Sequence, residues 1–220
     1  KKRINRVYYT FNDPDKRTYK RALKILNKNK IKIKKIKEKN KNFYKSYFLN
    51  KKNKFPLIDA KIAISKDFYT INKRSKNITN YRSRKVAHLI RSKYDCIVST
   101  SNSINKDNSL LNCRIDGLNN HKPDLIIIDR NLRLKKKLNL YSLTNKRKTY
   151  LFTTSNDNQK ISFLKKKKIR VIKLEKLTNK KDFEYLFKKI FNIGKSRILV
   201  ESGLIFLNKL LELRLVNDLY

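Results

Sequence analysis

Short apolar runs alternate with amphipathic stretches along most of the chain, and the first of them lie within its first fifty residues. Apolar residues at alternate positions indicate a strand, whereas three- and four-residue spacing indicates a helix. By this criterion Val7 to Thr10 is a strand, Lys16 to Asn27 a helix and Ile31 to Ile36 a second strand. The order predicts one βαβ unit, followed by a linking helix within the Lys- and Asn-rich segment from Lys37 to Lys54.

The pattern restarts after Pro56 and predicts a larger domain in which strands and helices alternate. The predicted strands are short and mostly apolar, as in strands buried on both faces, and they cover 57–64, 95–99, 125–128, 150–154, 171–174 and 198–200. The predicted helices cover 83–93, 159–167, 181–191 and 204–213, and Thr79 or Asn80 can cap the first of them. The segment between Ser101 and Arg114 is polar and lacks a clear period. We therefore predict an α/β fold with a parallel or mixed sheet covered on both faces.

Composition supports a globular chain, since 39% of its 220 residues are hydrophobic. No apolar run approaches the roughly 20 residues of a membrane span, and the start lacks the apolar core of a signal peptide. We expect a cytoplasmic protein. The chain has no Met and starts with Lys, which predicts a fragment of a longer protein. Cys96 and Cys113 are its only cysteines, and we expect reduced thiols and no metal site.

The charge of the chain allows two interpretations, because 58 Lys and Arg face 17 Asp and Glu, a net charge of +41. Such a balance favours binding of nucleic acid or an anionic membrane. However, the basic residues are spread over the whole chain, and abundant Lys, Asn and Ile with only three Gly indicate a compositional bias. We expect mainly a solvated surface and keep a basic nucleic-acid-binding module as the alternative function.

Candidate chemistry lies where the predicted strands end, because α/β sheets bind ligands beyond the carboxyl ends of their strands. A strand runs into Glu201, Ser202 and Gly203, and a helix opens at once. The free amides and the dipole at a helix start favour a phosphate, with Glu201 at the rim of the pocket. Taken alone, the same pattern also fits a simple turn.

A second group of polar residues lies between Ser101 and Arg114 and includes Ser103, Asp107 and Asn108. These residues also fit a surface loop in which Asp and Asn satisfy backbone amides. His88 lies on a predicted helix without Cys or carboxylate partners in the sequence, so we expect it to be structural.

These signals occur in the order and spacing of one family. From about Phe55 onward the chain resembles the reductase domain of the bifunctional diaminohydroxyphosphoribosylaminopyrimidine deaminase and 5-amino-6-(5-phosphoribosylamino)uracil reductase of riboflavin biosynthesis. The matching segments are Lys61 to Asp67, Ser75 to Thr79, His88 to Arg91, Asp107 to Arg114, Pro123 to Asp129, Val200 to Gly203 and Leu215 to Asp218. The resemblance implies an α/β fold with a dihydrofolate-reductase-like mixed sheet flanked by helices.

The first part resembles the end of the preceding domain in that family. Val7 to Ile33, with Phe11-Asn-Asp-Pro14, is similar to the last βαβ portion of the cytidine-deaminase-like domain. The zinc signature of such deaminases, His-x-Glu and later Pro-Cys-x-x-Cys, does not occur in the chain, so we expect no deaminase activity from it. We assign residues 1–50 to a deaminase remnant with the linking helix, and 51–220 to a reductase domain truncated before its last strands. The missing strands would weaken the homodimer that the resemblance implies.

The resemblance implies an oxidoreductase that transfers a hydride from NADPH to ribose C1′ of 5-amino-6-(5-phosphoribosylamino)uracil, which gives the ribitylamino product. It places Lys61 and Glu201 at the hydride step. Residues matching cofactor contacts are Ala63, Asn77, Ser103, Asp107, Arg130, Gly203, Leu204, Ile205, Phe206, Leu207, Asn208 and Lys209. Residues matching contacts to the phosphorylated pyrimidine substrate are Ser75, Arg91, Leu111, Arg114 and Glu201. Zinc would belong only to the missing deaminase domain.

Three positions depart from the family pattern. Phe68 replaces a usual Gly, and Ser109 replaces a usual Pro, which puts the geometry of two loops in question. Arg130 stands where a small polar residue is common, and its guanidinium could bind the 2′-phosphate of the cofactor.

Overall fold

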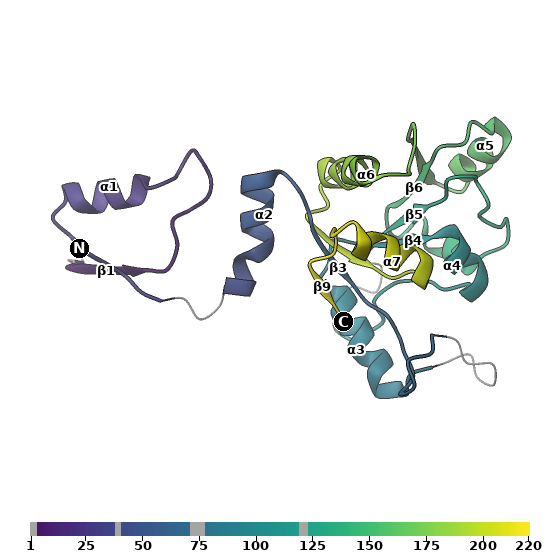
Figure 1. Cartoon of the computed structure of the whole chain (residues 1–220), viewed down its shortest axis with the longest axis horizontal. Coiled ribbons are helices and arrows are strands. Elements are labelled where there is room, and N and C mark those ends of the chain that lie inside the picture. Colours follow the sequence, from purple (N-terminus) through teal and green to yellow (C-terminus); the bar gives the residue numbers. More distant parts are fainter. Residues whose placement is uncertain (1–3, 38–40, 71–77, 119–122) are drawn as a thin grey trace. The chain divides into compact units, whose positions relative to one another are not determined.

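The computed structural model describes residues 4–37, 41–70, 78–118 and 123–220. The chain forms two compact units, Lys1–Leu57 and Ile58–Tyr220 (Figure 1). This division follows from the contacts within each unit and does not show which domain of a longer protein each unit derives from. The assignment of residues 1–50 to a deaminase remnant and of 51–220 to a truncated reductase domain therefore stays a prediction.

The first unit contains the βαβ arrangement that the sequence predicts. β1 (Arg6–Tyr9) and β2 (Lys32–Lys35) pair in parallel, and α1 (Arg21–Lys28) connects them. α1 begins later than predicted because Lys20 adopts a left-handed conformation, with a φ of 55°, which does not continue an α-helix. A short 3-10 helix, η1 (Lys41–Tyr44), leads into α2 (Lys45–Asn53) in place of one longer linking helix.

The second unit is built on one seven-stranded sheet. From edge to edge its strands are β7 (Ile169–Lys173), β6 (Thr149–Thr153), β5 (Asp124–Ile128), β4 (Cys96–Thr100), β8 (Arg197–Val200), β3 (Leu57–Ala60) and β9 (Asp218–Leu219). Every ladder described for this sheet is parallel: β4 with β5 and β8, β6 with β5 and β7, and β3 with β9. The predicted α/β fold class is confirmed.

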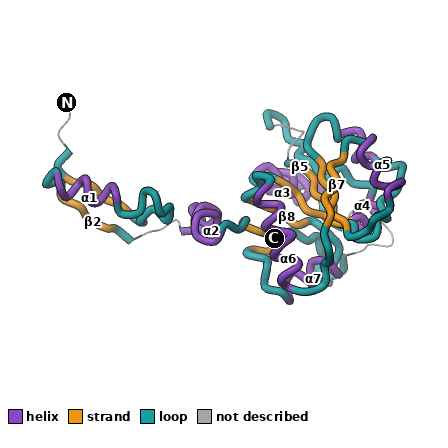
Figure 2. Tube along the Cα trace, turned by 90° about the horizontal axis from the view of Figure 1, so that it is seen from above, coloured by secondary structure: helices purple, strands orange, loops and turns teal. Residues whose placement is uncertain are grey.

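Helices cover both faces of this sheet. They are α3 (Tyr81–Ser92), α4 (Ser101–Asp107), α5 (Asn158–Lys166), α6 (Lys180–Asn192), α7 (Leu204–Glu212) and a 3-10 helix, η2 (Asn139–Leu143) (Figure 2). All five residues of β6 are buried, and successive side chains of a strand point to opposite faces, so neither face is open to solvent. Among the described residues no helix is long and apolar enough to cross a membrane.

The structure differs most from the sequence-based elements between β4 and β5. The polar segment after β4 begins with helix α4, which Thr100 caps by accepting the amide of Ser103 at 3.3 Å. Ile104 is the single large apolar side chain that α4 buries, so a helical period cannot show in the sequence. Elsewhere, Asn80 is the predicted cap of α3, since its side chain accepts the Ser83 amide at 2.8 Å.

Helix α6 offers a direct test of the predicted core. Leu186 is fully buried and Lys188 on the same helix is exposed. We expect Leu186→Ala to lower the free energy of unfolding by about 2–5 kcal/mol, because it removes buried methyl groups and leaves a cavity. Lys188→Ala should change it by less than about 0.5 kcal/mol. Urea unfolding followed by circular dichroism measures both, and equal effects would contradict this packing.

Candidate active site

Residues far apart in the sequence meet where the parallel strands have their carboxyl ends, and we call this end of the sheet its carboxyl edge. Lys61 follows β3, Glu201 follows β8 and Arg130 follows β5, while Ser103 lies in α4 directly after β4. The backbone holds these ends together, because the Lys61 amide donates to the Val200 carbonyl at 2.9 Å and the Glu201 amide donates to the Val98 carbonyl at 2.9 Å. The edge therefore carries candidate residues from four neighbouring strands.

Glu201 is the centre of a charged cluster at this edge. Its two carboxylate oxygens accept from Nε and Nη2 of Arg91, at 2.6 and 2.8 Å, in a bidentate pair. The Lys61 Nζ atom lies 3.9 Å from Oε2 of the same carboxylate. The side chain of Glu201 is 8% exposed and that of Lys61 is 21% exposed, so solvent reaches the ammonium more easily. Burial alone lowers the pKa of Arg91, but the hydrogen bonds and charge of Glu201 outweigh it and raise that pKa above its ordinary value.

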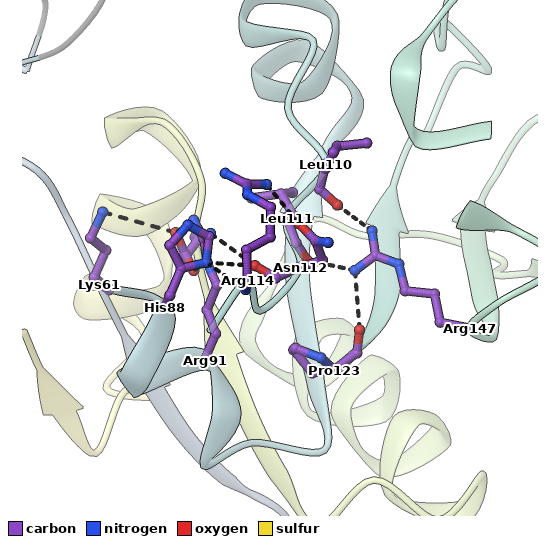
Figure 3. A network of polar contacts seen from close by, with 10 residues as sticks. Lys61, His88, Arg91, Leu110, Leu111, Asn112, Arg114, Pro123 and Arg147 are labelled. Atoms are coloured by element: carbon purple, nitrogen blue, oxygen red, sulfur yellow. Dashed lines mark hydrogen bonds and ion pairs between the residues drawn. The ribbon is translucent and has the colours of Figure 1, made fainter. Parts of the chain in front are cut away.

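A second layer of contacts comes from the segment after α4 (Figure 3). Nη1 of Arg91 donates to the carbonyl of Asn112 at 3.2 Å, and Nη1 of Arg114 donates to Oδ1 of the same residue at 2.7 Å. Partial burial and the positive charge of Arg91 lower the pKa of Arg114. Two guanidinium groups thus contact the same asparagine, and an anion bound by both would relieve their repulsion.

His88 belongs to this network, although the sequence indicated no partner for it. Its Nδ1 atom lies 3.0 Å from the Asn112 carbonyl and 3.2 Å from the Arg114 amide nitrogen. The first contact needs a hydrogen on Nδ1 and the second needs a lone pair, so each neutral tautomer satisfies one of them. The same Nδ1 atom lies 3.4 Å from Nη1 of Arg91. The spacing of these two residues, three positions apart on α3, puts both on one helix face and is the signal that could have found the contact between them.

Leu111 lies at the site through its backbone. Its side chain is 7% exposed and packs in a cluster of buried hydrophobic residues, together with Ile104 and Leu125. Its φ of 47° is in the left-handed region, which is strained for a side chain of this size. A ligand contact of Leu111 would therefore use a main-chain atom.

The start of α7 is connected to β4 through a hydroxyl group. Ser103 Oγ accepts from the Gly203 amide at 2.9 Å and lies 3.0 Å from Oγ1 of Thr100. Sequence reasoning assigned both Ser103 and Gly203 to the cofactor, and the structure brings them into contact. The contact also occupies one amide of the predicted phosphate-binding turn.

The span from Gly203 to Lys209 does not present one uniform surface. Leu207 is 3% exposed and its amide donates to the Gly203 carbonyl at 3.2 Å, so it faces the core. Ile205 is 88% exposed. The amides of a helix's first turn have no acceptor within the helix, so within this span such donors occur only at the start of α7.

The remaining predicted residues lie at the margins. Arg130 is exposed and its Nη1 donates to the Leu177 carbonyl at 3.2 Å. Asp107 is exposed at the end of α4, and Ala63 is partly buried in the loop after β3. Ser75 and Asn77 lie outside the described residues.

The loop after β3 keeps a tight turn despite the departure at residue 68. Phe68 has a φ of 64°, a conformation that glycine adopts without strain, and its side chain is 79% exposed. Ser65 holds the turn, since its carbonyl accepts the Phe68 amide at 3.0 Å and its Oγ accepts the Tyr69 amide at 2.9 Å.

A parallel sheet with a charged cluster at its carboxyl edge defines a ligand-binding domain of the α/β class. Comparison with family models makes this specific, because the model of the RibD C-terminal domain matches residues 56–220. The chain belongs to this family, the reductase domain family of riboflavin biosynthesis. No curated protein matches the chain significantly.

Solved structures show the same fold at low sequence identity. RibD of Acinetobacter baumannii matches with a TM-score of 0.77 and 15% identity over 98% of this chain and 59% of its own. The Thermotoga maritima diaminohydroxyphosphoribosylaminopyrimidine deaminase/5-amino-6-(5-phosphoribosylamino)uracil reductase matches with a TM-score of 0.76 and 21% identity over 95% and 57%. The Saccharomyces cerevisiae riboflavin biosynthesis reductase Rib7 matches with a TM-score of 0.60 and 20% identity, over 81% of this chain and 78% of its own. This chain thus spans less than three fifths of the two bacterial chains.

The His88 environment predicts a pH dependence of stability. Burial, and then the charges of Arg91 and Arg114, lower the pKa of His88 below its ordinary value of 6.5. Below that pH the imidazole is protonated in the unfolded chain but not yet in the folded one. The free energy of unfolding therefore decreases as the pH is lowered, until the pKa of the folded state is reached. We expect the free energy of unfolding to fall less steeply below about pH 6.5 in His88→Gln than in the wild type.

Urea unfolding at several pH values gives these slopes, and His121→Gln shows the contribution of the other histidine. Identical slopes in the wild type and His88→Gln would contradict the lowered pKa. Nuclear magnetic resonance titration of the two imidazole signals, assigned with the same variants, measures it directly.

Proposed function

We propose that this domain reduces 5-amino-6-(5-phosphoribosylamino)uracil to its ribitylamino product with NADPH as the hydride donor. The observation that carries the proposal is the cluster of Lys61, Glu201 and Arg91 at the carboxyl edge of the sheet, in a chain of the RibD C-terminal domain family. The name of the Thermotoga maritima relative includes this reductase activity.

The start of α7 suits the phosphate groups of a pyridine nucleotide. Gly117 and Gly194 have a positive φ, but Gly203 has a φ of −68°, so its own backbone does not require glycine. A Cβ atom at position 203 would meet only Ser103 Oγ, at the ordinary distance of 3.5 Å. Neither backbone conformation nor internal crowding demands glycine there, which supports close approach by an external group.

Arg91 and Arg114 suit the phosphate of the substrate. Both guanidinium groups contact Asn112, and each raises the positive potential at the other. A guanidinium binds phosphate through two parallel hydrogen bonds, which also fix the orientation of the bound group. Arg91 already uses Nε and Nη2 for Glu201, so the more exposed Arg114 has more donors available to the phosphate.

The charged cluster supports a proton transfer that accompanies reduction. When bound at this edge, NADPH would supply the hydride for C1′ of the open-chain imine. The electron pair of the carbon–nitrogen double bond then moves to nitrogen, which takes a proton from the Lys61 ammonium, and solvent restores that proton. Glu201 orients the ammonium from 3.9 Å and is itself held by Arg91.

The proposal includes the assembly and setting expected from the resemblance, a cytoplasmic homodimer. The alternative of a nucleic-acid-binding module rests on the net charge of +41. The charged cluster gives the reductase the more specific support.

Substitution of either central residue should remove most of the activity. We expect Lys61→Ala and Glu201→Ala each to lower kcat/KM by about 100-fold or more, because Lys61 is the proposed proton donor, which contributes roughly that much, and Glu201 positions it. Oxidation of NADPH, followed by its absorbance with the phosphoribosylaminouracil substrate, measures the rate. Lys188→Ala on α6 is the matched control and should retain the wild-type rate. Wild-type rates in both site variants would remove this site assignment.

Arg130 gives a separate test of cofactor choice. Its exposed guanidinium follows β5, and we propose that it binds the 2′-phosphate. Loss of one charge-assisted contact should raise the Kd of NADPH by about 10-fold in Arg130→Ala, while the Kd of NADH, which lacks that phosphate, stays the same. Isothermal titration calorimetry with both nucleotides measures this. An equal loss for NADH and NADPH would mean that Arg130 acts through its contact with Leu177 instead.

A further inference from the structure

Arg147 is a buried arginine outside the sites assigned so far. It lies just before β6 and is 6% exposed. Its Nη1 atom donates to the carbonyls of Leu111, at 2.5 Å, and Pro123, at 3.1 Å, and its Nη2 atom donates to the carbonyl of Leu110 (Figure 3). One side chain thus binds three main-chain oxygens from two separate segments.

The guanidinium of Arg147 is buried with hydrogen bonds to carbonyls and with one donor left unpaired. Among the described residues no carboxylate lies within 4.0 Å of Arg147, and its Nε atom is buried without a partner. Burial, opposed in part by the charge of Asp124, lowers the pKa of Arg147 to about 10, so it stays charged at neutral pH. A buried charge without an ion pair is destabilising compared with an apolar side chain of similar size.

Two of the carbonyls that Arg147 binds, those of Leu110 and Leu111, lie in the segment that carries candidate substrate residues. Leu110 and Leu111 precede Asn112, which contacts Arg91 through its carbonyl and Arg114 through its side chain. Two positions of this segment, Asn108 and Leu111, have left-handed φ values of 46° and 47°, which asparagine tolerates and leucine adopts with strain. Such conformations persist when surrounding contacts hold them, and Arg147 supplies contacts at the second of them.

We infer that Arg147 is a positioning residue for substrate binding. It holds the Leu110–Arg114 segment from the β6 side, while Arg91 and His88 hold it from α3. Arg114 is thereby kept next to the pair of Arg91 and Glu201, in the place where the substrate's phosphate and ribose would bind. This inference rests on the proposed function, because that function gives Arg114 and Leu111 their substrate contacts.

The test uses two substitutions at the same position. Arg147→Met keeps a long apolar side chain and removes all donors, whereas Arg147→Lys keeps the charge but loses the planar fork. We expect Arg147→Met to raise the KM for the phosphoribosylaminouracil by about 10-fold or more and to leave kcat and the KM for NADPH within about twofold, because binding contacts are displaced and the hydride step is not. Arg147→Lys should restore part of the affinity.

Hydrogen exchange of the ligand-free protein gives a second readout that does not require activity. In Arg147→Met the amides of residues 108–116 should exchange faster, while those of β4 and β5 keep their wild-type protection. Asp95→Asn is the control for a purely structural loss. Asp95 accepts from the Ser196 and Arg197 amides at the amino ends of the strands, away from the candidate site. This variant should therefore be less stable with an unchanged KM.

The outcomes separate the inference from the function on which it rests. Selective exchange of residues 108–116 together with the raised KM supports the inference. Uniform faster exchange, unchanged exchange, or an equal loss in kcat would overturn it and leave Arg147 a structural residue. A wild-type domain without NADPH oxidation would overturn the proposed function, and the exchange pattern alone would then decide whether Arg147 positions the segment.

Discussion

The bidentate pair between Arg91 and Glu201 fixes the relative positions of three parts of the fold. Glu201 follows β8, Arg91 lies on α3, and the same guanidinium binds the Asn112 carbonyl from the segment after α4. A pair this poorly exposed is tolerable only because the planar fork satisfies both carboxylate oxygens. Lys61 then reaches the outer side of a carboxylate that is already held in place.

The sequence predicted those parts of the fold and site that follow from hydrophobic patterning. Apolar runs located the central strands, and the carboxyl-end rule placed Glu201 beyond the end of its strand. Lys61 lies inside the predicted strand 57–64, so only the family resemblance assigned it to the site. Helix α4 could not be found because it buries only Ile104 among its large apolar side chains. Arg147 could not be found either, since it recognises main-chain carbonyls, which every residue carries and no sequence pattern distinguishes.

Family resemblance located positions without showing which atoms they expose. Leu111 and Leu207 matched ligand-contacting positions, yet both side chains lie in the core, so only their main chains remain for a ligand. Ser103 shows a different limitation, because its hydroxyl is committed to the Gly203 amide. Positions transferred from a family therefore acquire chemical meaning only when the hydrogen bonds within the chain are known.

Phe68 shows how a motif can change while the local structure stays the same. A left-handed conformation costs a residue with a side chain roughly 1–2 kcal/mol, which a glycine would avoid. Glycine, however, gives the unfolded chain more conformations to lose, at a cost of up to about 1 kcal/mol. The second effect offsets only part of the first, so Phe68 leaves a net cost in this exposed turn. The two hydrogen bonds to Ser65 hold the turn in spite of that cost, and the conformation of the loop is therefore kept by a neighbouring residue and not by the residue that adopts it.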